Sequence, residues 1–386
     1  KALLHVLTSL QCCGALLTKT PVARQGSAKV HISQVRQRRG FRRYVMQENF
    51  QFNIIYIMRN CGAHKPAAIN CLLSMIRHDL MHRTITNQRT PHVKAFFDTR
   101  TSTLTYVAHA DNCNQCVIID PVLDIDEASA TITTQNADSI VDYITSRGLV
   151  CRYILETHAH ADHLSAAFYL RNVLGGDIVI GADITKVQPV FATLYFEESD
   201  FPADGAQFDI LVTDGQTLPF GASTLLALHV PGHTPACMAY VIGDAVFCGD
   251  TLFMPDSGTA RCDFPGGDAS ALYRSIKRLL TLPDETRVFV CHDYQPDDRE
   301  IRFETTILDQ RERNIHVNQN VTLESFVQMR NSRDAELATP RLMLPAMQVN
   351  IRAGALPLHP TSKRPFLTLP INALNNDPTT LLTQKS

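Results

Sequence analysis

Three histidines and one aspartate lie close together in the segment Thr157-His158-Ala159-His160-Ala161-Asp162-His163. Two histidines separated by one residue can turn their rings to the same side of an extended segment, and the Asp-His pair adds ligands one step further on. Imidazole is the commonest metal-binding side chain, and such a density of ligand-type residues has no evident folding purpose. The segment therefore predicts a metal-binding loop.

Short apolar runs on either side position this loop. Tyr153–Leu155 predicts a buried strand before it, and Leu164–Leu170 predicts the opening of a helix after it. Upstream, Ser139–Ile144 has a possible capping serine and apolar residues at helical spacing, and Gly148 would end that helix. The histidines are therefore expected on a strand-to-helix connection, where side chains can face a cleft.

Three more residues of ligand type each follow a strand-like run further along the chain. They are His233 in a Pro-Gly-His-Thr-Pro turn, Asp250 in a Gly-Asp-Thr sequence, and His292 after a Val-Phe-Val-Cys run. A charged carboxylate at a buried strand end is costly when it is alone, so a cation beside Asp250 is expected. His233 is interpreted as a ligand, whereas His292 taken by itself fits a ligand or a structural role equally well.

Alternating strand-like and helical runs from Val93 onward predict a layered sheet-and-helix domain. A chain of 386 residues, 45% of them hydrophobic, can bury one large core or two smaller ones. Apolar residues at helical spacing after Leu323 predict a packing helix, and the segment after Ala353 contains five prolines. We therefore divide the chain into an unassigned basic extension (1–90), a catalytic domain (91–352) and a C-terminal tail (353–386).

The charge of the chain is unevenly distributed. Positions 1–90 hold 14 Lys and Arg residues and 2 acidic residues, a net charge of +12, so the remainder carries −14. The Arg-rich leader is interpreted as a solvated, poorly ordered extension, and a presequence for mitochondrial import is the alternative. No apolar run approaches the roughly 20 residues that span a bilayer, so no membrane span is expected.

The 11 cysteines form no evenly spaced disulfide framework, which favours a reducing compartment such as the cytoplasm. Cys113 and Cys116 have the CxxC spacing of a redox or zinc pair, but no second CxxC accompanies them. A buried structural role is expected for Cys116, because it opens a strand-like run and a free cysteine packs as a small hydrophobic residue.

The ordered set of motifs resembles the metallo-β-lactamase superfamily, from about Val93 to Ile351. The resemblance implies an α+β fold, an αββα sandwich of two sheets with helices outside, and a metal at the sheet edges. The segment Gly258–Gly267, with His292-Asp293-Tyr294, looks more narrowly like the persulfide dioxygenases. These enzymes oxidise glutathione persulfide to sulfite and glutathione with ferrous iron and O₂. Nothing in the leader matches this family.

The resemblance implies a role for each motif residue. It assigns one iron to His158, His233 and Asp250, and it makes His160, Asp162, His163 and His292 either supporting groups or ligands of a second metal. Two imidazoles and one carboxylate leave three positions of an octahedral ion open, as non-haem iron oxygenases need. Arg261 would bind the carboxylates of glutathione with Tyr294 as a hydroxyl partner, unless Arg261 forms a structural ion pair with Asp263.

Two other functions stay open. All seven ligand-type residues are present, so a hydrolase of the glyoxalase II type, with two zinc ions and a metal-bound hydroxide, is the main alternative. A binding protein that recruits nucleic acid or a membrane through the basic leader is the third. No nucleic acid is expected as a partner of the enzyme, and the sequence does not decide between a monomer and a homodimer.

Overall fold

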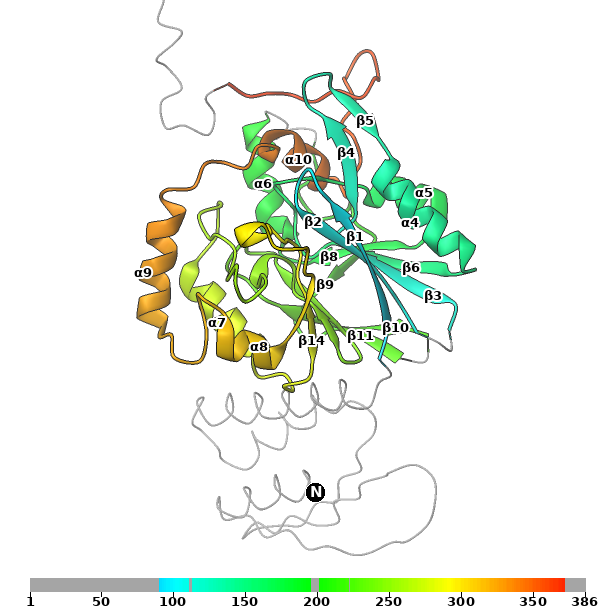
Figure 1. Cartoon of the computed structure of the whole chain (residues 1–386). Helices are drawn as coiled ribbons and strands as arrows, with labels where there is room; N and C mark the ends of the chain where they lie inside the picture. The colour runs from blue at the N-terminus through cyan, green and yellow to red at the C-terminus, as the bar shows by residue number, and fades with distance from the viewer. Residues whose placement is uncertain (1–89, 111–112, 196–200, 222, 372–386) are drawn as a thin grey trace, which may run out of the picture. The chain divides into compact units, whose positions relative to one another are not determined.

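Two six-stranded sheets form the centre of the protein in a computed structural model that describes residues 90–110, 113–195, 201–221 and 223–371 (Figure 1). The predicted extension 1–90 therefore lies, except for its last residue, outside the described residues. The sheets face each other through aromatic rings: Tyr106 contacts Phe247 and Phe289, and its hydroxyl donates to the carbonyl of Val290 at 2.6 Å. The predicted sandwich is confirmed.

The first sheet begins antiparallel and continues parallel. Two of its parallel strands, Gln115–Ile119 and Asp177–Gly181, are almost entirely buried, which explains why they read as uninterrupted apolar runs in the sequence. In spatial order its strands are His92–Asp98 (β1), Thr103–His109 (β2), Gln115–Ile119 (β3), Val150–Leu155 (β6), Asp177–Gly181 (β8) and Ile210–Val212 (β9).

The second sheet is antiparallel except where β13 pairs with β14. Its strands are Thr217–Phe220 (β10), Ser223–His229 (β11), Met238–Ile242 (β12), Ala245–Phe247 (β13), Arg287–Phe289 (β14) and Glu304–Thr306 (β15). A small third sheet joins Thr131–Thr133 (β5), Val122–Asp126 (β4) and Leu164–Ser165 (β7).

Helices cover the outer faces of the sandwich (Figure 1). Gln135–Ser146 (α4), Ala167–Leu174 (α5), Ile184–Leu194 (α6) and Met343–Asn350 (α10) contribute apolar side chains to one buried cluster with β3, β6 and β8. On the side of the second sheet lie Ala269–Leu279 (α7), Ile307–Arg313 (α8) and Leu323–Asp334 (α9). Two single 3₁₀ turns, Gly249–Thr251 (η1) and Pro296–Asp298 (η2), follow strands of the second sheet.

Two predicted helix starts are wrong. Leu164 and Ser165 do not open a helix, because they pair with Leu123 and Val122 of β4, and α5 begins only at Ala167. The upstream helix α4 begins at Gln135, so Ser139 is not its cap, and the Ser139 hydroxyl donates to the carbonyl of Gln135. In the first case, pairing with a strand distant in sequence overrides a local helical pattern.

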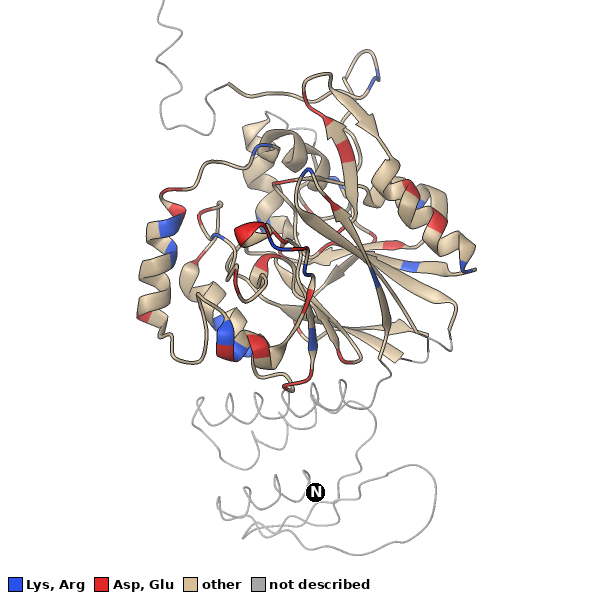
Figure 2. Ribbon diagram, in the orientation of Figure 1, with Lys and Arg blue, Asp and Glu red and all other residues tan. Residues whose placement is uncertain are grey.

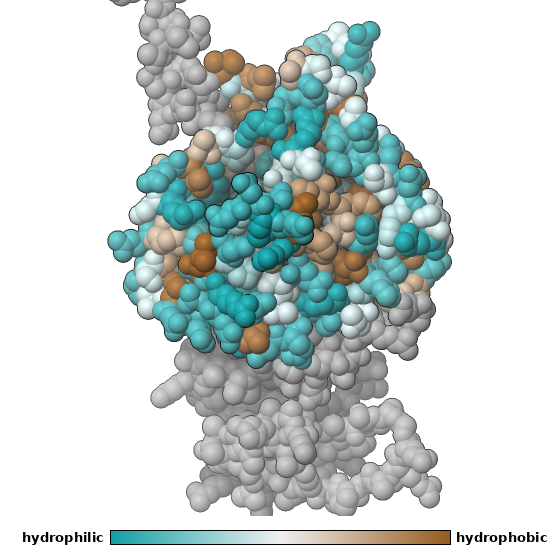
Figure 3. All heavy atoms as spheres, in the orientation of Figure 1, coloured by the Kyte–Doolittle hydropathy of each residue, from teal (hydrophilic) through white to brown (hydrophobic). Residues whose placement is uncertain are grey.

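The expectations for the C-terminal part of the chain, the cysteines and a membrane span can be compared with the described residues. The helix predicted after Leu323 is α9, and residues 355–371 contain no helix or strand. Cys116 is buried within β3, and no described cysteine forms a disulfide. No described helix has both the length and the apolar character needed to cross a membrane. The face of the molecule shown in Figure 3 is largely hydrophilic, with hydrophobic residues gathered in a few areas.

Candidate metal centre

The ligand-type residues meet at one edge of the sandwich, where strands of both sheets end. The loop after β6 carries His158, His160 and His163, whose side chains are at most 1% exposed. It is joined to the second sheet by a hydrogen bond from the amide of Met238 to the carbonyl of Thr157, at 2.8 Å. The strand-to-loop part of the sequence prediction is confirmed, and the histidines are buried rather than solvated.

His158, His233 and Asp250 form a compact set of three. Their ligand atoms lie within 4.8 Å of one another. Asp250 Oδ2 is 3.9 Å from His158 Nε2 and 3.6 Å from His233 Nε2. Gly249 allows this approach, because its φ is +51° and a Cβ atom there would lie 2.5 Å from Thr157 Oγ1.

Asp250 also faces a second group of ligand-type residues. Its Oδ1 lies 3.3 Å from His292 Nε2, which is also 3.3 Å from Asp162 Oδ2. His163 groups with Asp162 and His160. The structure therefore brings together all seven residues that the sequence singled out, with Asp250 between the two groups.

In four of these histidines, the ring is held by a polar contact to its Nδ1 atom. His158 Nδ1 lies 3.0 Å from Thr157 Oγ1, and His233 Nδ1 lies 2.7 Å from the carbonyl oxygen of Arg261. His163 Nδ1 lies 3.1 Å from the carbonyl oxygen of Leu164, and His292 Nδ1 lies 3.3 Å from that of Ser102. Fixing Nδ1 leaves Nε2 as the ligand atom, which is how proteins orient histidines toward a metal.

Several polar atoms at this edge are buried without a hydrogen bond. They include His158 Nε2, His163 Nε2, His292 Nε2 and Asp250 Oδ1. An unsatisfied buried polar group costs about 1–3 kcal/mol, so four together are explained by a group from outside the chain. Imidazole and carboxylate donors suit iron or zinc, and the residues therefore fit a metal.

Burial and neighbouring charge shift the pKa values here. Burial and the surrounding imidazoles hold the pKa of His158 well below its usual range, and burial first, then His160, lowers that of His163 to about 4. Burial opposes ionisation of Asp162, but its electrostatic interactions with the neighbouring His292, His163 and His160 outweigh burial and lower the pKa of Asp162 to about 2. Neutral imidazoles and an ionised carboxylate are the forms that bind metals.

His160 has different partners from the other histidines. Its Nε2 lies 3.0 Å from Asp120 Oδ1 and 3.6 Å from Glu156 Oε2, both buried carboxyl groups. Although burial opposes protonation, the charge of Asp120 raises the pKa of His160 to about 10, and burial raises that of Glu156 to about 8. His160 therefore has carboxylate partners outside the compact set of three, although it also groups with Asp162 and His163.

Asp120 supports the metal centre and was not predicted from the sequence. It directly follows β3, and its carboxylate accepts from the amide and the hydroxyl of Thr157, at 2.7 and 2.9 Å. The Thr157 hydroxyl in turn contacts His158 Nδ1. The Ile-Ile-Asp-Pro sequence at a strand end was the available signal, since an aspartate after a buried strand needs partners.

A cleft of about 390 Å³ opens onto the metal centre, within the usual range for small-molecule sites. Asp162, His233 and Asp250 line one part of it, and both Arg261 and Tyr294 line its wall. The Tyr294 ring stacks on His292 at 5.6 Å and is 56% exposed. The two residues predicted to bind substrate thus lie beside the centre.

The guanidinium of Arg261 is already engaged. Its Nε and Nη2 donate to the two carboxylate oxygens of Asp263, each at 2.6 Å, and Nη1 donates to the carbonyl of Ala338 at 2.7 Å. The alternative of a structural ion pair with Asp263 is therefore what the structure shows for this side chain. Its role in binding a substrate carboxylate stays a prediction.

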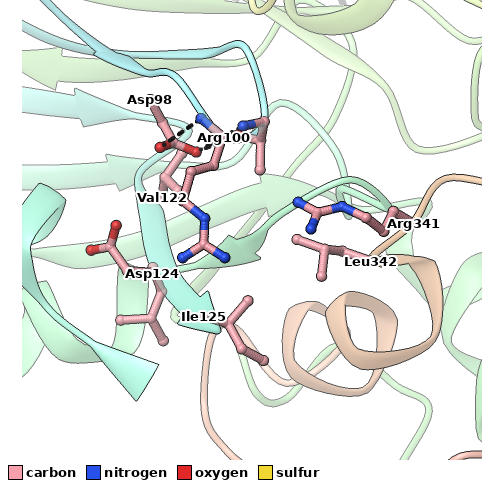
Figure 4. A pocket seen from close by; sticks show the side chains of 9 residues that line it. Asp98, Arg100, Val122, Asp124, Ile125, Arg341 and Leu342 are labelled. Carbon is pink, nitrogen blue, oxygen red and sulfur yellow. Dashed lines mark hydrogen bonds between the residues drawn. The ribbon is translucent and has the colours of Figure 1, made fainter. Parts of the chain in front are cut away.

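The sequence did not reveal other residues that line the cleft, among them Phe253, His316 and Arg333. They come from segments that become neighbours only in the folded protein, so spacing carries no signal for them. A second crevice, near Asp98, Arg100 and Arg341, has a volume of only about 10 Å³, room for about one water molecule (Figure 4). It is too small for a substrate.

Comparison with known proteins agrees with this geometry. Residues 98–292, about half of the chain, match the family described as "Metallo-beta-lactamase superfamily". The chain belongs to the metallo-beta-lactamase superfamily. It is 48% identical over 292 residues to a "Probable metallo-hydrolase" of Burkholderia pseudomallei, covering 73% of this chain and 99% of that protein.

Other members of the superfamily resemble this chain as well. A Dictyostelium discoideum protein named "Glyoxylase B2" is 43% identical, covering 73% of this chain and 97% of the relative. Human "Persulfide dioxygenase ETHE1, mitochondrial" is 29% identical, with 68% of this chain and 88% of the relative covered. The crystal structure of ETHE1 from Myxococcus xanthus, 29% identical, matches 68% of this chain and 100% of its own with a TM-score of 0.55.

Proposed function

We propose that this protein is an iron-dependent persulfide dioxygenase that oxidises glutathione persulfide with O₂ to sulfite and glutathione. The observation that carries the proposal is the compact set of His158, His233 and Asp250, beside which His160 turns its Nε2 toward Asp120 and Glu156. Two imidazoles and a carboxylate match the facial set of non-haem iron oxygenases. The sequence and structural similarity to ETHE1 supports the same activity.

The reaction balances when one persulfide, one O₂ and one water yield glutathione, sulfite and two protons. The outer sulfur of the persulfide gives up four electrons, and O₂ accepts them. Ferrous iron, when bound, supplies the redox centre at which persulfide and O₂ meet. The protein contributes the three ligands, the orientation of their rings and the shape of the cleft.

Side chains of the cleft position the substrate and limit water around the reacting sulfur. Phe264 packs edge-on against His233 at 5.1 Å, and Phe253 contacts both His292 and Tyr294 at 5.9 and 5.7 Å. These rings place an apolar wall beside the metal centre. His292 Nε2, which lies 3.3 Å from both Asp250 Oδ1 and Asp162 Oδ2, would hold a water or a proton there together with Asp162.

A zinc-dependent thioester hydrolase of the glyoxalase II type is the second candidate. It is favoured by the position of Asp250 between two ligand groups and by the identity of 43% to "Glyoxylase B2". In that enzyme His160 would be a metal ligand rather than a partner of Asp120. The Arg-Cys-Asp-Phe sequence at 261–264, which resembles the dioxygenases, argues against it.

Metal content and substrate preference separate the two candidates. The protein is purified without oxygen, iron and zinc per chain are measured, and each metal form is assayed with glutathione persulfide and with S-lactoylglutathione. We expect one iron per chain and consumption of the persulfide only. Two zinc ions per chain with cleavage of the thioester would replace the dioxygenase by the hydrolase.

A further inference from the structure

His316 presents an uncommitted hydrogen-bond donor to the cleft. The side chain is 8% exposed and lines the cleft, and its Nδ1 accepts from the amide of Thr259 at 3.0 Å. Burial, together with Arg330 and Arg333, lowers the pKa of His316 to about 4, so the ring is neutral and carries its proton on Nε2. Within the described part of the chain, Nε2 has no hydrogen-bond partner.

The position of His316 is tightly defined. Gly258 packs against the ring, with φ of +88°, and a Cβ atom there would lie 2.1 Å from Nδ1. Asn314, two residues earlier, accepts from the amide of His316 and donates to the carbonyl of Gly258. The ring is therefore fixed by contacts on the side away from the cleft, and the Nε2 donor is pre-oriented.

Helix α9 adds positive charge to the same part of the cleft. Its basic residues lie near its C-terminal end (Figure 2). Arg330 is buried, pairs with Asp334 at 2.8 Å and donates to the carbonyl of Thr259 at 3.0 Å. Asp334 also accepts from the amide of Cys262. These bonds attach α9 to the 259–262 segment and so fix where Arg333 meets the cleft.

The arginines that line the cleft differ in whether a carboxylate pairs with them. Arg261 is paired with Asp263, and Arg330 is paired with Asp334. Arg333 also lines the cleft, and among the described residues no carboxylate pairs with it. A guanidinium that is exposed to a cleft and lacks an anionic partner, next to a buried imidazole donor, has the chemistry of a carboxylate site.

We infer that Arg333 and His316 bind a carboxylate of the substrate and so select a persulfide whose carrier is anionic. This inference rests on the proposed function for the identity of the carrier, glutathione, which has two carboxylates. His233 and Asp250 of the proposed iron-binding set also line the cleft, so one molecule can reach both the metal and the pair Arg333 and His316. Arg333 and His316 are specificity residues and do not touch the reacting sulfur.

The test compares variants with glutathione persulfide and with cysteamine persulfide, which has no carboxylate. Arg333→Ala raises the KM for glutathione persulfide about tenfold, the equivalent of one charge-assisted hydrogen bond, and leaves kcat within about twofold. The KM for cysteamine persulfide does not change. Arg333→Lys recovers part of the loss, and Arg313→Ala, which removes an exposed arginine of α8, is the control with no effect.

Two variants of His316 separate binding from folding. His316→Asn keeps an acceptor near the amide of Thr259 and removes the donor to the cleft, so it raises KM. His316→Gln keeps a donor near the position of Nε2 and raises KM less. Calorimetric titration of the metal-loaded protein with glutathione gives a second measurement, in which Arg333→Ala weakens binding by the same factor as it raises KM.

The outcomes distinguish this inference from the proposed function. If the wild type takes up no O₂ but cleaves S-lactoylglutathione, the dioxygenase fails, and the same variants are assayed for the KM of the thioester. A carboxylate site persists if Arg333→Ala raises that KM. If Arg333→Ala changes neither KM nor glutathione affinity in the reaction that the wild type performs, the carboxylate site does not exist.

Discussion

His292 and Asp293 are adjacent, are both at most 1% exposed, and yet are stabilised in opposite ways. Asp293 accepts hydrogen bonds from Arg299 Nη1 and Nη2, at 2.7 and 2.8 Å, and from the amide of Arg302 at 2.7 Å. His292 faces two carboxylates with an Nε2 that makes no hydrogen bond. The chain itself supplies the partners of Asp293, whereas at His292 it leaves a polar atom that a metal would satisfy.

The largest effect is expected at the metal centre, where the chain leaves buried polar atoms without partners. His158→Ala removes a ligand, so the protein loses its metal and its activity falls by more than about 100-fold. Loss of a residue that only hydrogen-bonds to a ligand costs at most about 100-fold, so removal of the ligand itself should cost more. Metal per chain and turnover are measured together. A variant that keeps both the metal and the activity of the wild type would show that His158 is not a ligand.

A smaller effect, on stability alone, is expected at Asp293, whose partners all come from the chain itself. Arg299→Gln leaves the Asp293 carboxylate buried without its cation and lowers the free energy of unfolding by about 3–5 kcal/mol. Metal content stays that of the wild type. Urea unfolding measures the loss, and Arg287→Gln, whose partner Asp244 is partly exposed, costs at most about 1 kcal/mol as the matched control.

The metal centre was easier to predict than the cleft around it. The seven ligand-type residues were recognisable because four of them crowd one loop after β6 and the other three each follow an apolar run, where a charged or imidazole side chain needs a reason to be buried. His316 and Arg333 gave no such signal, because their role depends on contacts with Thr259 and Arg330 across the fold. The pairing of Leu164 with β4 could not be predicted either, because β4 is distant from it in the sequence.

Acidic pH should destabilise the cleft through His316. The pKa of this ring is about 4 in the folded protein and about 6.5 in the unfolded chain, so below pH 6.5 the unfolded state binds the additional proton. Stability then falls with pH by at most about 1.4 kcal/mol per unit, less where solvent in the cleft screens the ring. Urea unfolding at pH 6.5 and 4.5 checks this. If His316→Asn loses as much stability between these two pH values as the wild type does, other groups are responsible for the loss.

The smallest effect is expected at Arg261. Because Asp263 and Ala338 already occupy its donors, Arg261→Ala raises the KM for glutathione persulfide only about twofold to threefold, well below the effect of Arg333→Ala. Steady-state kinetics at saturating O₂ provide the comparison. A larger rise for Arg261→Ala than for Arg333→Ala would return the carboxylate role to Arg261.

Oxygen uptake tests the central claim most directly. The protein loaded with ferrous iron is given glutathione persulfide in an oxygen-electrode cell, and O₂ consumed and sulfite formed are counted against the persulfide supplied. The dioxygenase account predicts one O₂ and one sulfite for each persulfide. Absence of O₂ uptake by the iron-loaded protein, while the zinc-loaded protein cleaves S-lactoylglutathione, would contradict it.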